Sequence, residues 1–306
     1  MGLVKRRILG SYSALCMLVM LIIICSTGYA RADLVDVKQN GVLRHLGVPY
    51  AHFVRKTPNG YDGLDVEVMR LFAQHIGVKY EFISTTWTDL FTDLTGRELD
   101  VISKKYSPLV TQKIKGDIIA NGLTVLPNRK LIVDYSVPTF PTGVWLIAPA
   151  GSSLSPIVPS GNIDNDVALV NSMLSGHSVL TMQNTCLDHN NFTFNPAIVD
   201  IKYFTTGKTI KDIVPAMLSG DADATLLDVP DALITLQEKS REIKVIGPVS
   251  GAQVMGAAFA KNSPELLKSY NEFFKVIWKD GTYRKIVEKY YPTVFLYYND
   301  FFSTQY

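Results

Sequence analysis

The chain has 306 residues, of which 47% are hydrophobic and 19% are charged. This composition fits one large or two medium globular domains and excludes a disordered chain. Its 30 basic and 28 acidic residues give a formal net charge of +2. No basic stripe or basic and aromatic array stands out, so we expect no nucleic-acid partner.

The first 32 residues have the order of a secretory signal peptide. A basic cluster at residues 5–7 precedes the apolar run ALCMLVMLIIICSTG, and the small-x-small pattern ARA follows at residues 30–32. We expect cleavage before Asp33 and an exported mature protein. An uncleaved membrane anchor is the alternative, although the apolar run is short for a complete span.

Removing residues 1–32 changes both the charge and the cysteine count. The segment holds four basic residues and no acidic one, so the remainder has 26 basic against 28 acidic residues, a net charge of −2. Of the three cysteines, only Cys186 remains, and we expect no intramolecular disulfide. Cys186 and His189 form only a weak pair, so we predict no metal site and no cofactor.

Strand-like and helix-like segments alternate along the chain in two series. The first series has predicted strands at 42–48, 78–84, 116–121 and 144–150 and helices at 64–77 and 87–96. The second has predicted strands at 177–183, 221–228, 243–248 and 254–260 and helices at 164–176, 209–220, 230–240, 264–281 and 282–291. Alternating strands and helices predict mostly parallel sheets with flanking helices, and two series predict two lobes.

The two lobes are not expected to follow one another simply along the chain. The strands at 144–150 and 254–260 are similarly apolar and lie far apart, so we place both at a junction. The prediction is a first lobe of residues 33–146 plus 252–306 and a second lobe, 147–251, inserted through a two-strand hinge. Ligands favour the space between lobes, so we expect a binding cleft there.

Several segments carry a resemblance to a known family, in that family's order. They are GVLRHLGVPYAHF (41–53), GYDGLDVEVMRLFAQHIGVKYEF (60–82), TTWTDLFTDL (85–94), NGLTVLPNRK (121–130), VDYSVPTFPTGVWLIA (133–148), LSGDADATLLDVPDA (218–232) and KDGTYRKIVEKYYP (279–292). The chain resembles the bacterial extracellular solute-binding proteins of family 3, the amino-acid receptors of ABC importers. The resemblance implies an α/β fold of the type II periplasmic-binding-protein kind, with a cleft between two lobes.

The resemblance gives the stretch NGLTVLPNRK a role in binding a carboxylate. In the family, the arginine of this motif grips the ligand carboxylate, and it corresponds to Arg129. Thr124 corresponds to a second donor, and Gly122 to a residue whose carbonyl faces the ligand ammonium. A planar guanidinium suits a carboxylate because it can donate two parallel hydrogen bonds. The alternative for Arg129 is a solvated helix residue.

The second lobe supplies three further residues by the same resemblance. Asp228 stands where the family keeps its ammonium-binding aspartate, and a helix N-cap before Pro230 is a role that could coexist with it. Thr185 and Cys186, in QNTC, stand where backbone N–H groups complete the carboxylate site.

Two aromatic residues correspond to the walls of the family's side-chain pocket. They are Tyr50 and Trp87, for which core packing is the alternative. The chain departs from the family pattern at Pro49 and Asn184, in the segments 97–115 and 151–176, and in the aromatic tail 294–306. The roles of these segments stay open.

The resemblance implies a periplasmic protein, a monomer and not an enzyme, that captures an amino-acid-like ligand. It would close two lobes by hinge bending and deliver the ligand to an ABC permease of the inner membrane. One alternative is a cyclohexadienyl or prephenate dehydratase on the same fold, with Asp188 or Asp228 as general acid. Another is a ligand-sensing receptor module. The identity of the ligand stays open.

Overall fold

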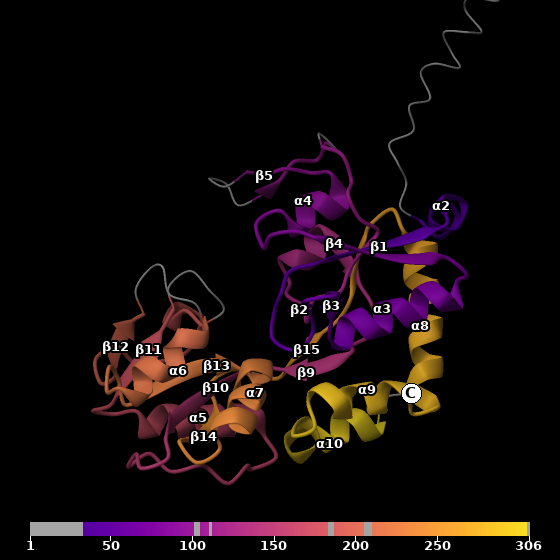
Figure 1. Ribbon diagram of the computed structural model, residues 1–306. Helices are drawn as coiled ribbons and strands as arrows, with labels where there is room; N and C mark the ends of the chain where they lie inside the picture. The colour runs from indigo at the N-terminus through magenta and orange to yellow at the C-terminus, as the bar shows by residue number, and fades with distance from the viewer. Residues whose placement is uncertain (1–32, 101–104, 110–111, 183–186, 205–209, 305–306) are drawn as a thin grey trace, which may run out of the picture.

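The protein folds around two separate sheets, each with five strands (Figure 1). The computed structural model describes residues 33–100, 105–109, 112–182, 187–204 and 210–304. Helices flank each sheet, and the two units lie side by side with a narrow connection between them. The predicted α/β fold with two lobes is confirmed.

The first lobe is built on the sheet β4-β1-β7-β16-β8. These strands are β4 (Lys79–Ser84), β1 (Val42–Gly47), β7 (Ile118–Ile119), β16 (Ala258–Ala260) and β8 (Val133–Tyr135). On one face lie α2 (Leu34–Asn40), α3 (Leu64–His75) and α8 (Pro264–Lys279), and on the other lies α4 (Leu90–Thr95). Helix α9 (Thr282–Tyr290) packs against α3 and α8.

The second lobe is built on the sheet β12-β11-β13-β10-β14. These strands are β12 (Asp200–Tyr203), β11 (Ser178–Thr181), β13 (Ala224–Asp228), β10 (Val144–Pro149) and β14 (Ile243–Pro248). Helix α5 (Ile163–Met173) packs on one face, and α6 (Ile210–Leu218) and α7 (Val229–Lys239) pack on the other. The side chains of β10 alternate accordingly, with Leu146 on the α5 face and Trp145 on the α6–α7 face.

Both sheets are mixed, which refines the expectation of mostly parallel strands. In the first, β1 pairs in parallel with β4 and β7, whereas β16 is antiparallel to β7 and β8. In the second, β11 pairs in parallel with β12 and β13, whereas β10 is antiparallel to β13 and β14. The antiparallel pairings involve β10 and β16, the strands next to the connection between the lobes.

A two-stranded sheet connects the lobes. Strand β9 (Phe140–Thr142) leads into β10, and β15 (Gln253–Met255) leads back into β16. The two are antiparallel, with Gln253 opposite Thr142 and Met255 opposite Phe140. The single strand predicted at 254–260 is therefore two strands. They separate at Gly256 because the chain leaves the hinge there and joins the first sheet.

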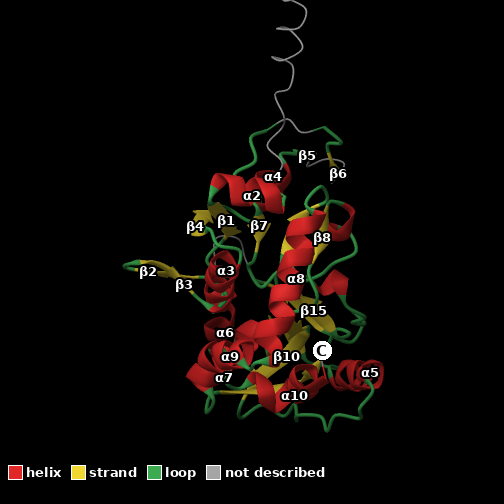
Figure 2. Ribbon diagram, turned by 90° about the vertical axis from the view of Figure 1, so that its right-hand side faces the viewer, coloured by secondary structure: helices red, strands yellow, loops and turns green. Residues whose placement is uncertain are grey.

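The remaining elements are short or lie at the periphery. They are the strands β2 (Arg55–Thr57), β3 (Gly60–Asp62), β5 (Leu99–Asp100) and β6 (Lys105–Tyr106), the 3-10 helices η1 (Arg129–Leu131) and η2 (His189–Asn191), and helix α10 (Val294–Thr304). Figure 2 shows the β2–β3 hairpin projecting from the side of the first lobe and α10 at the lower end of the molecule. Among the described residues, every helix falls short of the length and apolarity that crossing a membrane requires.

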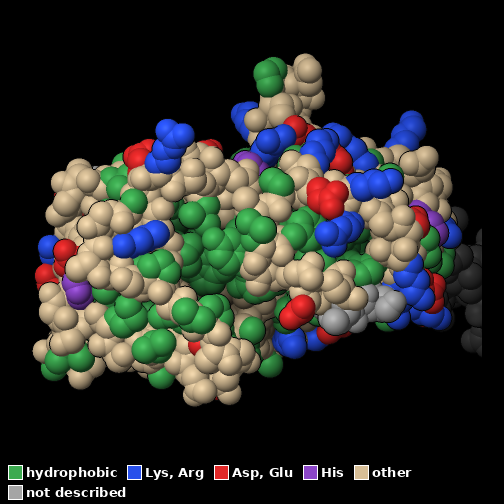
Figure 3. Space-filling view, turned by 90° about the horizontal axis from the view of Figure 1, so that it is seen from below, with side chains coloured by type: hydrophobic (Ala, Val, Ile, Leu, Met, Phe, Trp, Pro, Cys, Tyr) green, Lys and Arg blue, Asp and Glu red, His purple; other side chains and the backbone are tan. Residues whose placement is uncertain are grey.

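Seen from below, the molecule carries a concentration of hydrophobic side chains near the middle of its face (Figure 3). Figure 1 places α10 in this part of the molecule. Two side chains of α10 are among the exposed large hydrophobic residues, Leu296 at 80% and Tyr297 at 47% exposure. Helix α10 thus exposes hydrophobic side chains at the lower end of the molecule.

Candidate functional site

The loop that follows β7 has a backbone that only glycine accommodates. Gly122 is buried and has a left-handed φ of 55°. A Cβ at this position would lie 2.3 Å from the ring of Phe53. Its backbone N–H donates a hydrogen bond of 2.7 Å to Oδ2 of Asp65, at the start of α3. Two buried neighbours therefore hold the loop in place.

Thr124 connects this loop to the hinge. It forms an isolated antiparallel bridge with Met255 of β15, and the N–H of Val125 donates to the carbonyl of Val254 at 2.9 Å. The predicted carboxylate loop is therefore hydrogen-bonded to one of the two strands that join the lobes.

Arg129 is the first residue of η1, and its side chain turns back over the loop. The side chain of Asn128 accepts a hydrogen bond from the N–H of Arg129 and caps the short helix. Nη1 of Arg129 donates to the carbonyl of Thr124 at 2.9 Å, and Cζ lies 5.8 Å from the centre of the Phe91 ring. The guanidinium is half-buried and held beside Thr124, so the structure brings these two predicted residues together.

Tyr135 also reaches this carbonyl, and the sequence analysis missed it. Its hydroxyl donates to the carbonyl of Thr124 at 3.3 Å. Burial raises the pKa of Tyr135 to about 12, although the charge of Arg129 opposes the shift. The phenol stays protonated at neutral pH and remains a donor. Its segment VDYSVP entered the family resemblance, which assigned no role to this tyrosine.

The predicted aromatic pair lies on the same lobe. The ring of Tyr50 meets that of Trp87 edge-on, with centroids 5.7 Å apart and an interplanar angle of 79°. On its other side Tyr50 stacks on Phe53, which also packs against Gly122. Trp87 is 46% exposed, so core packing does not account for it. Phe53 thus links the aromatic pair to the carboxylate loop.

Asp228 lies in the second lobe, at the carboxyl end of β13. It occupies the N-cap position of α7, as the alternative predicted, but its side chain makes no capping hydrogen bond. Its backbone is paired with that of Val144, which follows the hinge strand β9. A short path of paired strands therefore runs from Thr124 through Met255 and β9 to Asp228.

Thr185 and Cys186 lie outside the described residues. The neighbouring Asp188 caps η2, accepting hydrogen bonds from the backbone and side-chain nitrogens of Asn190 at 3.0 and 2.8 Å. His189 Nδ1 lies 2.9 Å from the hydroxyl of Tyr203. Asp188 therefore caps this turn.

Two buried titratable groups position the loop, and the sequence analysis assigned no role to either. Burial raises the pKa of Asp65 to about 7, although the N–H of Gly122 opposes the shift. Burial lowers the pKa of His45 to about 4. His45 Nε2 lies 2.6 Å from the carbonyl of Ala120 and Nδ1 lies 2.8 Å from the hydroxyl of Tyr80. Because a carbonyl only accepts, Nε2 carries the proton and Tyr80 donates to Nδ1.

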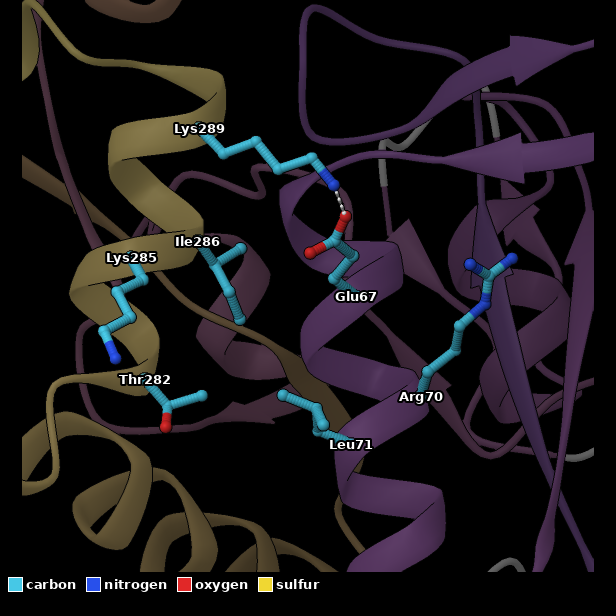
Figure 4. Close-up of a pocket in the computed structure, with 7 residues that line it drawn as sticks. All are labelled: Glu67, Arg70, Leu71, Thr282, Lys285, Ile286 and Lys289. Carbon is cyan, nitrogen blue, oxygen red and sulfur yellow. Dashed lines mark hydrogen bonds and ion pairs between the residues drawn. The ribbon is translucent and has the colours of Figure 1, made fainter.

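A cavity of about 450 Å³ lies elsewhere, between α3 and α9 (Figure 4). It is lined by Glu67, Arg70, Leu71, Thr282, Lys285, Ile286 and Lys289. Lys289 makes an ion pair with Glu67 across its mouth. A second cavity of similar volume lies behind the carboxylate loop, near Tyr135 and Val254. The predicted ligand residues line neither of these two cavities.

The sequence model of the bacterial extracellular solute-binding proteins, family 3, matches residues 46–109 and 108–293. The chain belongs to this family. The matched residues include Gly122, Thr124, Arg129 and Asp228, and they end before α10.

Relatives in this family include both binding proteins and a larger enzyme. The membrane-bound lytic murein transglycosylase F of Desulfosudis oleivorans is 23% identical over 262 residues, 84% of this chain and 50% of that enzyme. The chain thus spans half the length of that relative. The L-cystine-binding protein TcyJ of Escherichia coli is 24% identical over 229 residues, 75% of this chain and 74% of that protein.

A solved structure supports the fold. The ancestral amino-acid-binding protein AncCDT-1, a precursor of cyclohexadienyl dehydratase, is 27% identical to this chain. The superposition covers 84% of this chain and 98% of the other, with a TM-score of 0.61.

Proposed function

We propose that this solute-binding protein captures an amino acid, or a related carboxylate, between its two lobes. The supporting observation is the placement of Arg129, which is held beside Thr124 on a loop bonded to the hinge. A half-buried guanidinium at that position suits a ligand carboxylate, because the pair is charge-assisted and partly shielded from water.

We propose Asp228 as the partner of the ligand ammonium. It belongs to the second lobe, yet the paired strands bring its backbone within a short path of Thr124. A zwitterionic ligand would then contact a cation on one lobe and an anion on the other. Such a ligand favours the closed arrangement because only that arrangement provides both contacts.

Tyr50 and Trp87 are the proposed contacts of the ligand side chain. Trp87 is 46% exposed beside Tyr50, so its indole is accessible to an aromatic, basic or polar group of the ligand. Thr185 and Cys186 remain the proposed donors from the second lobe.

We propose a signal peptide at residues 1–32, a periplasmic location and delivery to an ABC permease. The proposed lobes are 33–146 plus 252–306 and 147–251; this boundary falls within β10 (Val144–Pro149), whose residues from Val144 onward pair in the second sheet. Amino-terminal sequencing of the exported protein tests the cleavage, with Asp33 as the expected first residue.

A thermal-shift screen tests the binding function. It covers the twenty amino acids, dicarboxylates, polyamines and prephenate, each with the wild type, Arg129→Ala and the control Arg241→Ala, whose side chain is exposed on the second lobe. A ligand at a hundredfold excess over its Kd stabilises the fold by about 2.7 kcal/mol. We expect an amino-acid hit that is lost in Arg129→Ala and kept in Arg241→Ala. The absence of any amino-acid hit would contradict the proposal.

A dehydratase is the second candidate, because AncCDT-1 is a precursor of that enzyme. The reaction needs a general acid above the substrate. Asp188 caps η2, away from the hinge, whereas Asp228 ends β13 opposite Val144, next to the hinge strand β9, so Asp228 is the candidate to test. Incubation of the pure protein with prephenate decides the matter: turnover that is lost in Asp228→Asn would establish the enzyme, and tight amino-acid binding without turnover would exclude it.

A further inference from the structure

Helix α10 is an addition to the family pattern that packs across the hinge. The family match ends at residue 293, and α10 covers Val294–Thr304. The helix is interrupted at Tyr298, where φ is −133° and ψ is 35°. Consecutive residues of a regular helix do not face the same neighbour. The interruption allows Tyr297 and Tyr298 to contact one residue together.

That residue is Trp145, which belongs to the second lobe. The ring of Tyr298 lies parallel to the indole, with an interplanar angle of 4° and centroids 6.0 Å apart. The ring of Tyr297 lies 4.8 Å from it. Trp145 is buried and Tyr298 is half-buried, and its burial raises the pKa of Tyr298 to about 12. At the start of the helix, Gln237 of α7 donates to the hydroxyl of Thr293 at 3.4 Å.

The other end of α10 is fixed to the first lobe and to the hinge itself. The ring of Phe302 stacks on Trp278 of α8, with centroids 5.9 Å apart and an interplanar angle of 12°. It also meets Phe140, in the hinge strand β9, edge-on at 6.1 Å. One hydrophobic core consequently continues from the first lobe to the second through the residues of this helix.

The position of α10 relative to the hinge gives these contacts a mechanical consequence. Figure 1 places α10 below β9 and β15 and α4 above them, and Figure 2 shows the same order for α10, β15 and α4. Trp87 and the carboxylate loop belong to the region of α4. A rotation that closes the lobes on the α4 side moves them apart on the α10 side. Closure therefore strains or breaks the contact between Tyr298 and Trp145.

We propose that α10 is a clamp that holds the lobes in the arrangement seen here and opposes closure. Losing the Tyr298 contact then lets the free protein sample closed arrangements. A pre-existing closed population lowers the cost of closing, so a ligand that selects it binds more tightly. Only this last consequence rests on the proposed ligand function.

The test is the distance between the lobes in the absence of ligand. Spin labels attached through Glu81→Cys and Asp200→Cys measure this distance, because both positions are exposed on edge strands of the two sheets. Cys186→Ser removes the native thiol that would also be labelled. The variant is Tyr298→Ala. The matched control is Leu296→Ala, on the same helix but 80% exposed. Circular dichroism confirms that each variant is folded.

We expect Tyr298→Ala to broaden the distance distribution and shift it toward shorter separations, while Leu296→Ala matches the wild type. Phe302→Ala, which releases the other end of the clamp, should act in the same direction. An unchanged distribution in both folded variants would overturn the proposal. Because no ligand is present, this result is independent of whether the binding function is correct.

Discussion

The buried carboxylate of Asp65 accepts a hydrogen bond from the backbone N–H of Gly122, across 57 residues of sequence. This contact fixes the start of the loop that carries Thr124 and Arg129. The group that provides it titrates near neutral pH, since burial raises its pKa from 3.8 to about 7. The stability of the fold is thereby coupled to pH.

The sign of this coupling follows from proton uptake. Between about pH 4 and pH 7 the folded protein keeps a proton on Asp65 that the unfolded chain has released. Raising the pH through this range therefore removes stability, by up to about 4 kcal/mol for a shift of this size. Asp65→Asn keeps an acceptor oxygen and cannot ionise. In chemical unfolding at pH 5 and pH 8, we expect the variant to lose less stability than the wild type. Equal losses of stability in the wild type and Asp65→Asn would refute the raised pKa of Asp65. The control Asp164→Asn, at an exposed position, should lose as much stability as the wild type.

His45 imposes the opposite pH dependence. Burial lowers its pKa from 6.5 to about 4. Between these two pH values the unfolded chain therefore binds a proton at His45 that the folded protein does not bind. Stability from this group rises with pH between about 4 and 6.5, by up to roughly 3 kcal/mol. In the Asp65→Asn background we expect stability to increase over this range. A flat or falling profile there would contradict the buried, neutral His45.

Gly122 is the most constrained position of the loop. In Gly122→Ala the new methyl group meets the buried ring of Phe53 in addition to the left-handed backbone. Gly77→Ala is the matched control, because Gly77 also has a positive φ but open space around its Cβ position. We expect about 1–2 kcal/mol of destabilisation for the control and roughly 1–3 kcal/mol more for Gly122→Ala. Chemical unfolding of the two variants measures the difference, and equal values would exclude the contact with Phe53.

Trp87 should matter for binding far more than for folding. Its side chain is 46% exposed, so Trp87→Ala should change the unfolding free energy by less than about 1 kcal/mol. Loss of the aromatic wall should weaken ligand binding by about 1 kcal/mol or more. Calorimetric titration of the ligand identified by the screen measures this, with the exposed Val276→Ala as control. A variant that binds as well as the wild type would remove Trp87 from the site.

The long, periodic elements could be predicted from the sequence, and the short ones could not. Helix α3 and strand β10 begin at the predicted residues and end within two of the predicted ends. The hairpin β2–β3, helix α2 and the strands β8, β9 and β12 were missed because three to seven residues show too little periodicity. Helix α10 was missed for another reason. The stretch VFLYYNDFF has apolar residues on nearly all sides, since it packs against both lobes, and it therefore lacks the one-sided pattern that marks a surface helix.

For the site, the sequence pointed to the residues proposed to contact a ligand but not to those that hold them in place. Arg129, Thr124 and Gly122 came from one motif, and the structure brings them together. Asp65, His45 and Tyr135 act through contacts between distant parts of the chain, which no local pattern encodes. Asp65 lies in the segment GYDGLDVEV, but that segment indicated only the start of a helix.

The most direct test of the account is a double-mutant cycle between Arg129 and the ligand carboxylate. Calorimetry would compare the best amino-acid ligand with the corresponding amine that lacks the carboxylate, in wild type and Arg129→Ala. If the two groups are paired, removing either one costs affinity and removing both costs little more, with a coupling energy of roughly 2 kcal/mol or above. Additive losses would mean that Arg129 does not hold the carboxylate, and would contradict the proposed site.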